Sequence, residues 1–398
     1  MISTPQQLEE VVAKAMNSEA VGIDTEFVWE RTYYPCLGII QIGFSDDDCV
    51  LIDALEIKDL TPLGELLSSR DTTKILHDAR QDLWILKRHT NTLPRGIFDT
   101  RSAAGFVGFG STRSLGNLLL DSIGIDLPKT ETRTDWLRRP LSEMQCTYAL
   151  DDVRYLPSVR QTLLDKAREN NHEHWLQEEM SSFDDPDLYV EKDPKEQFLR
   201  VKGISKVSAR DLAIVRELAA WREEEARRQD KPKNRIFQDD TLVQLARRKP
   251  KTASSLKGFR GLNGGTNKGN VQNILNVIQR GLELPQSDCP QPPRFRPDPP
   301  PIDAQLDMAM AFLKGRCLSS GIDIALIASR SAVKAMVAQG PGASAENHPI
   351  LRGWRYEFLG KDLVQLLEGN LAIRLDPTTD LPQLACENSN PVQTGEIG

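Results

Sequence analysis

The stretch Val21-Gly22-Ile23-Asp24-Thr25-Glu26-Phe27 decides the fold of the first half of this 398-residue chain. Its apolar beginning is typical of a buried β-strand. In a strand, residues i and i+2 project to the same face, so Asp24 and Glu26 point the same way. Two like charges side by side on a sheet are unfavourable unless a positive charge lies between them. The pair therefore suggests ligands for a hard divalent cation, although a solvent-exposed strand end is the alternative interpretation.

Tyr148 and Asp152 lie four positions apart in the sequence. Residues 141–159 predict a helix, with Ser142 as its N-cap and Pro157 near its end. Because residues i and i+4 share a helical face, the phenol and the carboxylate are expected side by side. This arrangement suits a metal ligand next to a group that orients a water molecule. The alternative is a helix that packs Tyr148 into the core and exposes Asp152 to solvent.

A third acidic position lies in His77-Asp78-Ala79-Arg80-Gln81-Asp82-Leu83. Residues 74–77 have the pattern of a strand end, and Asp82 begins an amphipathic helical pattern. Asp78 and Asp82 are both candidate ligands, although Asp78 is also well placed to cap the helix. Together the acidic motifs predict a centre for two divalent metals, which can cleave a phosphodiester by stabilising both the attacking and the leaving oxygen.

These motifs resemble the DEDD superfamily of 3′–5′ exonucleases, in the branch whose third motif is Tyr-x-x-x-Asp, and more narrowly the bacterial ribonuclease D family. The resemblance extends over residues 1 to about 180 and includes Thr32-Tyr33-Tyr34-Pro35 and Asp135-Trp136-Leu137-Arg138-Arg139-Pro140-Leu141. It implies a ribonuclease-H-like α/β fold. We expect a mixed sheet flanked by helices, with strands at residues 20–24, 37–44, 49–53, 74–77 and 96–99.

The resemblance also implies a role for each site residue. The four metal ligands and the tyrosine that orients the attacking water are Asp24, Glu26, Asp82, Asp152 and Tyr148. The spacing after His77 favours Asp82 over Asp78 as the ligand. Two ions per site are expected, either Mg²⁺ or Mn²⁺. We further expect Thr25 to contact the RNA 3′ end through its backbone amide and Phe27 to stack on the terminal base.

The charge is unevenly distributed along the chain. The formal net charge is −7, but residues 198–284 carry roughly +10. A basic segment attracts phosphate backbones, so Arg247-Arg248-Lys249 are candidate RNA contacts, with a merely solvated surface as the alternative. The run Ala220-Trp221-Arg222 with Asp230-Lys231-Pro232 resembles the HRDC domain, a helical nucleic-acid-binding fold shared by RecQ-type helicases and ribonuclease D.

Composition shifts divide the chain into domains and linkers. The proline-rich run before residue 302 predicts a stiff connector, and the last residues lack periodicity. The resemblance implies that a second HRDC-like helical domain follows the connector. The expected units are the exonuclease domain (1–180), a linker (181–197), an HRDC domain (198–285), a proline-rich linker (286–301), the second HRDC-like domain (302–375) and a disordered tail (376–398).

The expected function is that of a cytoplasmic 3′–5′ exoribonuclease. It would release nucleoside 5′-monophosphates and trim the 3′ ends of tRNA precursors and other small structured RNAs. The six cysteines form no C-x-x-C pair and suggest a reducing compartment, and no apolar run is long enough to span a membrane. We expect no membrane partner and no small-molecule cofactor.

Two alternatives to this function remain open. A DNA 3′–5′ exonuclease of the same fold would carry the same motifs, because recognition of the 2′-OH depends on local geometry. A non-catalytic RNA-binding adaptor is the other alternative. The presence of all four carboxylates and the tyrosine argues against an adaptor.

Overall fold

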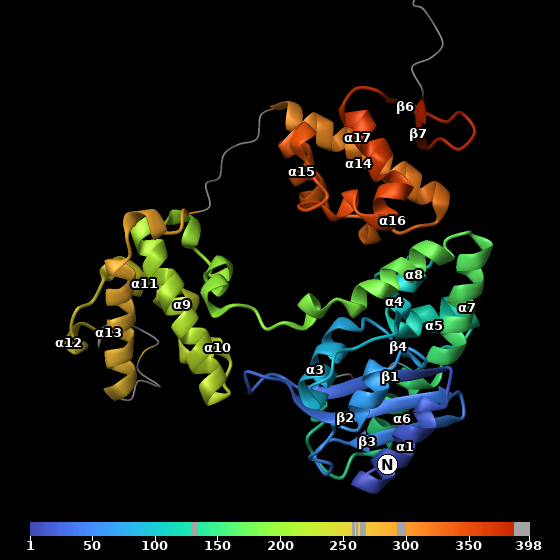
Figure 1. Cartoon of the computed structure of the whole chain (residues 1–398), viewed down its shortest axis with the longest axis horizontal. Coiled ribbons are helices and arrows are strands. Elements are labelled where there is room, and N and C mark those ends of the chain that lie inside the picture. Colours follow the sequence, from blue (N-terminus) through green and yellow to red (C-terminus); the bar gives the residue numbers. More distant parts are fainter. Residues whose placement is uncertain (129–133, 257–258, 260–261, 263–267, 293–299, 386–398) are drawn as a thin grey trace, which may run out of the picture.

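The computed structural model describes residues 1–128, 134–256, 259, 262, 268–292 and 300–385. Figure 1 shows an α/β domain and two helical units. We call these the first helical unit, which begins in the segment after residue 190, and the second helical unit, which begins at Pro300.

A five-stranded mixed sheet forms the centre of the α/β domain. Its strands are β1 (Ala20–Val28), β2 (Cys36–Ser45), β3 (Asp48–Asp53), β4 (Thr73–Leu76) and β5 (Ile97–Asp99), in the spatial order β3-β2-β1-β4-β5. Strand β2 is antiparallel to both β1 and β3, whereas β4 pairs in parallel with both β1 and β5. The predicted mixed sheet is confirmed, with β1 extending four residues beyond its predicted end.

Helices cover both faces of this sheet. On one face, Ile23, Ile40 and Ile42 pack against α2 (Leu63–Ser68) and α3 (Arg80–Thr90). On the opposite face lie α6 (Glu143–Arg154) and α7 (Leu156–Glu169). The helix α1 (Pro5–Met16) has Thr4 as its N-cap and buries Leu8 and Val12 in the same core. The remaining helices of the domain are α4 (Thr100–Ala104), α5 (Leu115–Ile123) and α8 (Glu173–Ser181).

Two glycines allow α6 to lie directly on the sheet. Gly22 of β1 and Gly43 of β2 are paired across the strands. A Cβ atom at Gly22 would lie 2.7 Å from the carbonyl oxygen of Val153, and one at Gly43 would lie 2.5 Å from the same atom. Any larger side chain would therefore push away the end of α6, one residue from Asp152.

The single helix predicted over residues 141–159 is wrong. The chain forms α6 and α7 with a break at Tyr155, and Pro157 lies in the first turn of α7. The proline lacks a backbone N–H and is tolerated at a helix start but not inside a helix. The start of α6 was predicted correctly, because Ser142 caps it and forms a reciprocal capping box with Gln145.

The segment 181–197 is more ordered than a free linker. It contains the 3₁₀ turns Ser182–Asp184, Pro186–Tyr189 and the beginning of Pro194–Arg200, and it buries Phe183 and Tyr189 in the core of the α/β domain. The first helical unit continues with α9 (Ala209–Gln229), α10 (Lys233–Ile236), α11 (Asp239–Arg248), α12 (Ala253–Leu256) and α13 (Lys268–Glu283). It has a hydrophobic core of its own, separate from the core of the α/β domain.

The second helical unit shares the core of the α/β domain. Its elements are α14 (Pro300–Ser320), α15 (Arg330–Gln339), α16 (Gly353–Arg355), α17 (Lys361–Leu367), β6 (Ala372–Leu375) and β7 (Pro382–Ala385). Trp354 packs against Phe106 with ring centroids 4.7 Å apart, and Arg355 pairs with Glu179 at 2.9 Å. In Figure 1 this unit lies over α4 and α8.

The prediction of a disordered tail from residue 376 is wrong as far as residue 385. Strand β7 pairs with β6 and packs against α14. A strand of four residues is too short to show a clear alternating pattern in the sequence. Its position is set by its packing against α14, which the sequence pattern does not reveal. Residues 386–398, and residues 293–299 of the predicted proline-rich linker, lie outside the described part of the chain.

Candidate active site

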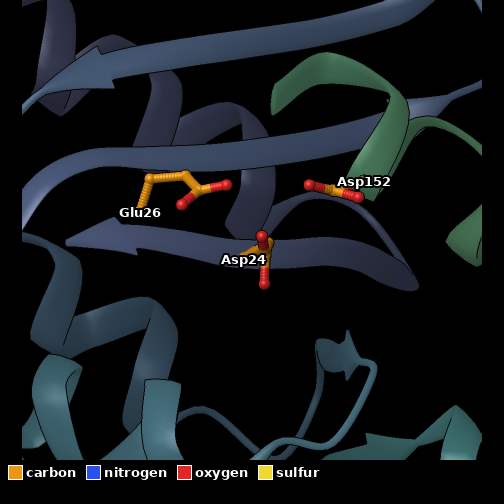
Figure 2. Close-up of side chains that lie close together, drawn as sticks. All are labelled: Asp24, Glu26 and Asp152. Carbon is orange, nitrogen blue, oxygen red and sulfur yellow. The ribbon is translucent and has the colours of Figure 1, made fainter. Parts of the chain in front are cut away.

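Three of the predicted carboxylates meet on the face of the sheet that α6 covers. Asp24 and Glu26 project from β1, and Asp152 projects toward them from α6 (Figure 2). One oxygen atom of each carboxylate lies within 4.8 Å of the others. The i, i+2 spacing on a strand and the docking of α6 thus produce a compact cluster of hard oxygen donors.

Asp82 lies next to this cluster and is buried, with 8% of its surface exposed. It occupies the first turn of α3, where the hydroxyl of Thr25 donates a hydrogen bond to its carboxylate. Although Asp82 is not among the three residues within 4.8 Å, its charge raises the pKa of both Asp24 and Glu26.

Asp78 lies outside the group of three clustered carboxylates. Its side chain is 60% exposed and forms an ion pair with Arg101. Its backbone has a positive φ of 65°, and Asp99 accepts a hydrogen bond from its amide. This geometry favours Asp82 over Asp78 as a member of the site.

Burial raises the pKa of the three clustered carboxyl groups and of Asp82. The pKa of Glu26 rises to about 8, that of Asp152 to about 7 and that of Asp82 to about 6, and the pKa of Asp24 is raised well above its ordinary value. Mutual repulsion adds to the effect of burial. A donor set of four such carboxylates fits a bound divalent cation, which would hold them in the ionised form.

Tyr148 lies beside Asp152, as its position one turn earlier on α6 requires. Its ring packs against Trp136, with centroids 6.1 Å apart. Burial and the charges of Asp152, Glu26 and Asp24 raise the pKa of its hydroxyl. Tyr148 is therefore a hydrogen-bond donor at neutral pH and not a base.

A cleft of about 1380 Å³ lies between the α/β domain and the first helical unit. Its walls come from the β1–β2 loop, the start of α3, the segment after α8, and the helices α9, α10 and α11. Four aromatic side chains line it, together with basic ones that include Arg80, Arg200, Lys202, Lys206, Lys233 and Arg247; the aromatic residues are Trp29, Tyr33, Tyr34 and Trp84. None of the four carboxylates lines the cleft, but its lining includes Trp29, the residue after β1, and Arg80 and Trp84, which stand two positions before and after Asp82 on α3.

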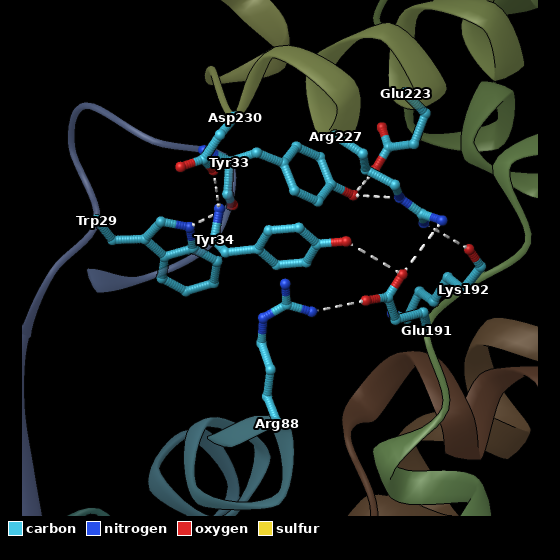
Figure 3. Close-up of polar contacts among 9 residues, drawn as sticks. All are labelled: Trp29, Tyr33, Tyr34, Arg88, Glu191, Lys192, Glu223, Arg227 and Asp230. Carbon is cyan, nitrogen blue, oxygen red and sulfur yellow. Dashed lines mark hydrogen bonds and ion pairs between the residues drawn. The ribbon is translucent and has the colours of Figure 1, made fainter. Parts of the chain in front are cut away.

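The β1–β2 loop contacts the first helical unit, mostly through residues that also line this cleft (Figure 3). Tyr33 bonds to Glu223 and Arg227 of α9 through its hydroxyl. The carboxylate of Asp230 accepts hydrogen bonds from the backbone amides of Tyr33 and Tyr34, at 3.0 and 3.2 Å. Nothing in the sequence pattern indicated these contacts, which join residues almost 200 positions apart.

The three consecutive basic residues Arg247, Arg248 and Lys249, which we call the basic triplet, have different neighbours. Arg247 lines the cleft and donates to the carbonyl of Lys206. Arg248 lies over the ring of Phe259, and Lys249 pairs with Asp211 at 2.7 Å. The three side chains thus have different neighbours, because consecutive residues at a helix end point in different directions, and their contacts with RNA stay predictions.

The other two predicted substrate contacts lie near the cluster. Thr25 is buried, and its backbone N–H lowers the pKa of Asp24 and Asp82. Phe27 is partly buried against the main core, beside an irregularity in the strand register at Glu26. Their contacts with RNA stay predictions.

The sequence is similar to those of known proteins. The 3′–5′ exonuclease family matches residues 1–168, and the HRDC domain family matches residues 211–278. Ribonuclease D from Desulfotalea psychrophila is 40% identical over 371 residues, which cover 92% of this chain and 97% of that protein. The chain belongs to the ribonuclease D family. Ribonuclease D from a Jannaschia species is 36% identical, over 94% of this chain and 96% of that protein.

A solved structure supports this assignment to the ribonuclease D family. The crystal structure of Escherichia coli RNase D, described as an exoribonuclease involved in structured RNA processing, has a TM-score of 0.81 and 28% identity. The alignment covers 93% of this chain and 98% of that one. The predictions of a ribonuclease-H-like exonuclease domain, an HRDC domain and 3′–5′ exoribonuclease activity are confirmed. Among the described residues, no helix is both long and apolar enough to cross a membrane.

Proposed function

We propose that this ribonuclease D family member trims the 3′ ends of small structured RNAs, with tRNA precursors as the expected case, in the cytoplasm. The products are nucleoside 5′-monophosphates. The observation that carries the proposal is the group of three carboxylates from β1 and α6 whose oxygens lie within 4.8 Å of one another. Such a group is unfavourable without bound cations and becomes favourable with them.

The proposed site holds two divalent ions, Mg²⁺ or Mn²⁺. Asp24, Glu26 and Asp152 would hold one ion, and Asp24 with Asp82 would hold the other. When bound, such ions lower the pKa of a water molecule and stabilise charge on the leaving oxygen. Thr25 keeps Asp82 in place through its hydroxyl hydrogen bond.

The tyrosine would orient the attacking water. Because the pKa of Tyr148 is raised, its hydroxyl keeps its proton and holds the water by a hydrogen bond without removing the proton. Attack of the water oxygen on phosphorus forms one P–O bond. The bond to the 3′ oxygen of the preceding nucleotide breaks. The attacking water gives up a proton to solvent, and the departing 3′ oxygen takes one up from solvent and becomes the hydroxyl of the new 3′ end.

We also propose that the cleft guides the RNA to this site. Aromatic side chains stack on unpaired bases irrespective of sequence, and basic side chains follow the backbone. Trp29 is 47% exposed, as a stacking platform must be. Arg247 contributes to the basic wall from α11. The second helical unit, which we propose to be a second HRDC-type domain, supports the α/β domain through their shared core.

The experiment uses the full chain, because the second helical unit shares the core of the catalytic domain. A 3′-extended tRNA and a single-stranded DNA of equal tail length are incubated with the enzyme, with and without Mg²⁺. We expect stepwise release of nucleoside 5′-monophosphates from the RNA only, and only with the metal. Preferential degradation of DNA would instead favour the DNA exonuclease alternative. RNA binding without cleavage under any metal condition would favour the adaptor.

A pair of charge-reversal variants tests the cleft. Arg247→Glu should weaken binding of the 3′-extended tRNA and reduce the steepness with which affinity falls as salt rises. Arg280→Glu makes the same charge change on α13, at an exposed position outside the cleft lining, and should have a much smaller effect. Equal losses in the two variants would show that only the overall charge of the first helical unit matters.

A further inference from the structure

Gln41 is a buried side chain for which the fold provides no partner. It lies in the middle of β2 and is 0% exposed. Neither its amide nitrogen nor its amide oxygen has a hydrogen-bond partner among the described residues. Burying a primary amide without hydrogen bonds is unfavourable, so a polar group at such a position calls for an explanation.

The strand register places this amide next to the acidic cluster. Gln41 pairs directly with Asp24 of β1, and on its other side it pairs with Leu51 of β3. Directly paired residues of antiparallel strands project to the same face, with Cβ atoms about 4.5–5.5 Å apart. Along β2 the neighbours on this face are Ile39 and Gly43. Of these four flanking residues, only Asp24 has a polar side chain.

The helix α6 covers Gln41 on this face of the sheet. Ala149 of α6 packs with Ile39 and Leu51, and Val153 contacts Gly43. Gln41 therefore lies beneath the same helix that carries Asp152, in surroundings that are otherwise apolar. An isolated core position of this kind would be filled more favourably by leucine or methionine than by glutamine.

We propose that Gln41 is a positioning residue of the metal centre. With a divalent cation bound, the amide N–H of Gln41 donates a hydrogen bond to the Asp24 carboxylate and fixes its orientation toward the cation. Carboxylates that bind metals are commonly oriented by such outer partners, and loss of the partner typically weakens metal affinity or activity by about 10–100-fold. This inference rests on the proposed metal site and adds to it a residue that does not itself bind the cation.

The test measures Mn²⁺ binding to the full chain by calorimetry, with Gln41→Met as the variant. Methionine has nearly the same shape but cannot donate a hydrogen bond. We expect at least a tenfold loss in Mn²⁺ affinity and a matching shift in the Mn²⁺ concentration that gives half-maximal cleavage. The KM for RNA should not change, and the metal-free melting temperature should stay the same or rise, because two unpaired polar atoms are removed from the core.

Thr72→Val is the matched control. It also removes a buried polar group from the same domain without changing its shape, since the hydroxyl of Thr72 is fully buried and bonds to the carbonyl of Ala15. This variant should lower the melting temperature equally with and without Mn²⁺ and leave the Mn²⁺ affinity unchanged. Gln41→Leu serves as a second apolar variant in case methionine packs poorly.

The outcomes separate this inference from the proposed function. If the wild-type chain does not bind Mn²⁺, the proposed metal site itself is wrong. If the wild type binds Mn²⁺ and both Gln41 variants bind it equally well, only the inference is overturned. Failure of both Gln41 variants to fold would make Gln41 a structural residue and would overturn the inference as well.

Discussion

Replacing Glu26 by glutamine is expected to stabilise the metal-free protein, and to do so only above acidic pH. The folded protein holds the pKa of Glu26 at about 8, against an ordinary value of 4.5. Between these pH values the folded state binds more protons than the unfolded state, so stability falls as pH rises. The stability that the protonated Glu26 carboxyl group contributes is fully present below its unfolded pKa. It is lost as the pH rises through the folded pKa of about 8.

The magnitude follows from the size of the shift. Each pKa unit corresponds to about 1.4 kcal/mol. Raising the pKa of Glu26 from 4.5 to about 8 therefore lowers the free energy of unfolding of the metal-free protein by on the order of 4 kcal/mol at about pH 8. Glutamine carries no charge at any pH and avoids this loss. For a domain of this size, about 1 kcal/mol corresponds to roughly 2–4 °C, so Glu26→Gln should raise the melting temperature by roughly 10 °C.

Thermal denaturation in the presence of EDTA at about pH 5 and about pH 8 measures the effect. The difference between Glu26→Gln and the wild type should be small at the lower pH and large at the higher one. Glu9→Gln, at an exposed position on α1, should show no such dependence. Adding Mg²⁺ at the higher pH should stabilise the wild type and have little effect on Glu26→Gln. Parallel pH profiles of the wild type and Glu26→Gln in EDTA would refute the reasoning.

Four further substitutions test the arrangement of the site. Tyr148→Phe should slow single-turnover cleavage by roughly 10²–10⁴-fold without changing RNA affinity, and an unchanged rate would make Tyr148 a core residue only. Asp82→Asn should abolish cleavage while Asp78→Asn keeps most of it, and the reverse result would reassign the ligand. Gly43→Ala should displace α6 at Val153 and lower both the cleavage rate and the melting temperature, which circular dichroism and the same cleavage assay would measure.

Features set by local periodicity were predictable from the sequence. The common direction of Asp24 and Glu26 follows from the two-residue repeat of a strand, and the proximity of Tyr148 to Asp152 follows from the helical turn. The Ser142 cap was predictable for the same reason, since its partner Gln145 lies only three residues away. Each of these features depends on residues within a few positions of one another.

Features that depend on long-range packing were not predictable in this way. The hydrogen bond from Thr25 to Asp82 spans 57 positions, and the contacts of the β1–β2 loop with α9 span almost 200. The different surroundings of Arg247, Arg248 and Lys249 were not predictable either, because the composition of a segment gives its charge but not the direction of each side chain. Arg247 reaches the cleft only because of how α11 packs against α9.

The assembly of the acidic cluster combines both kinds of feature. Strand periodicity brings Asp24 and Glu26 to one face, but Asp152 reaches them only because Gly22 and Gly43 let α6 rest on the backbone of β1 and β2. In the sequence these glycines are two small residues in apolar runs, where they would ordinarily weaken a strand. Their role becomes clear only from the structure, in which α6 lies directly against them. The close packing of α6 on the sheet also buries Gln41 in an otherwise apolar layer. We therefore infer that this polar side chain serves the metal centre and not the packing of the core.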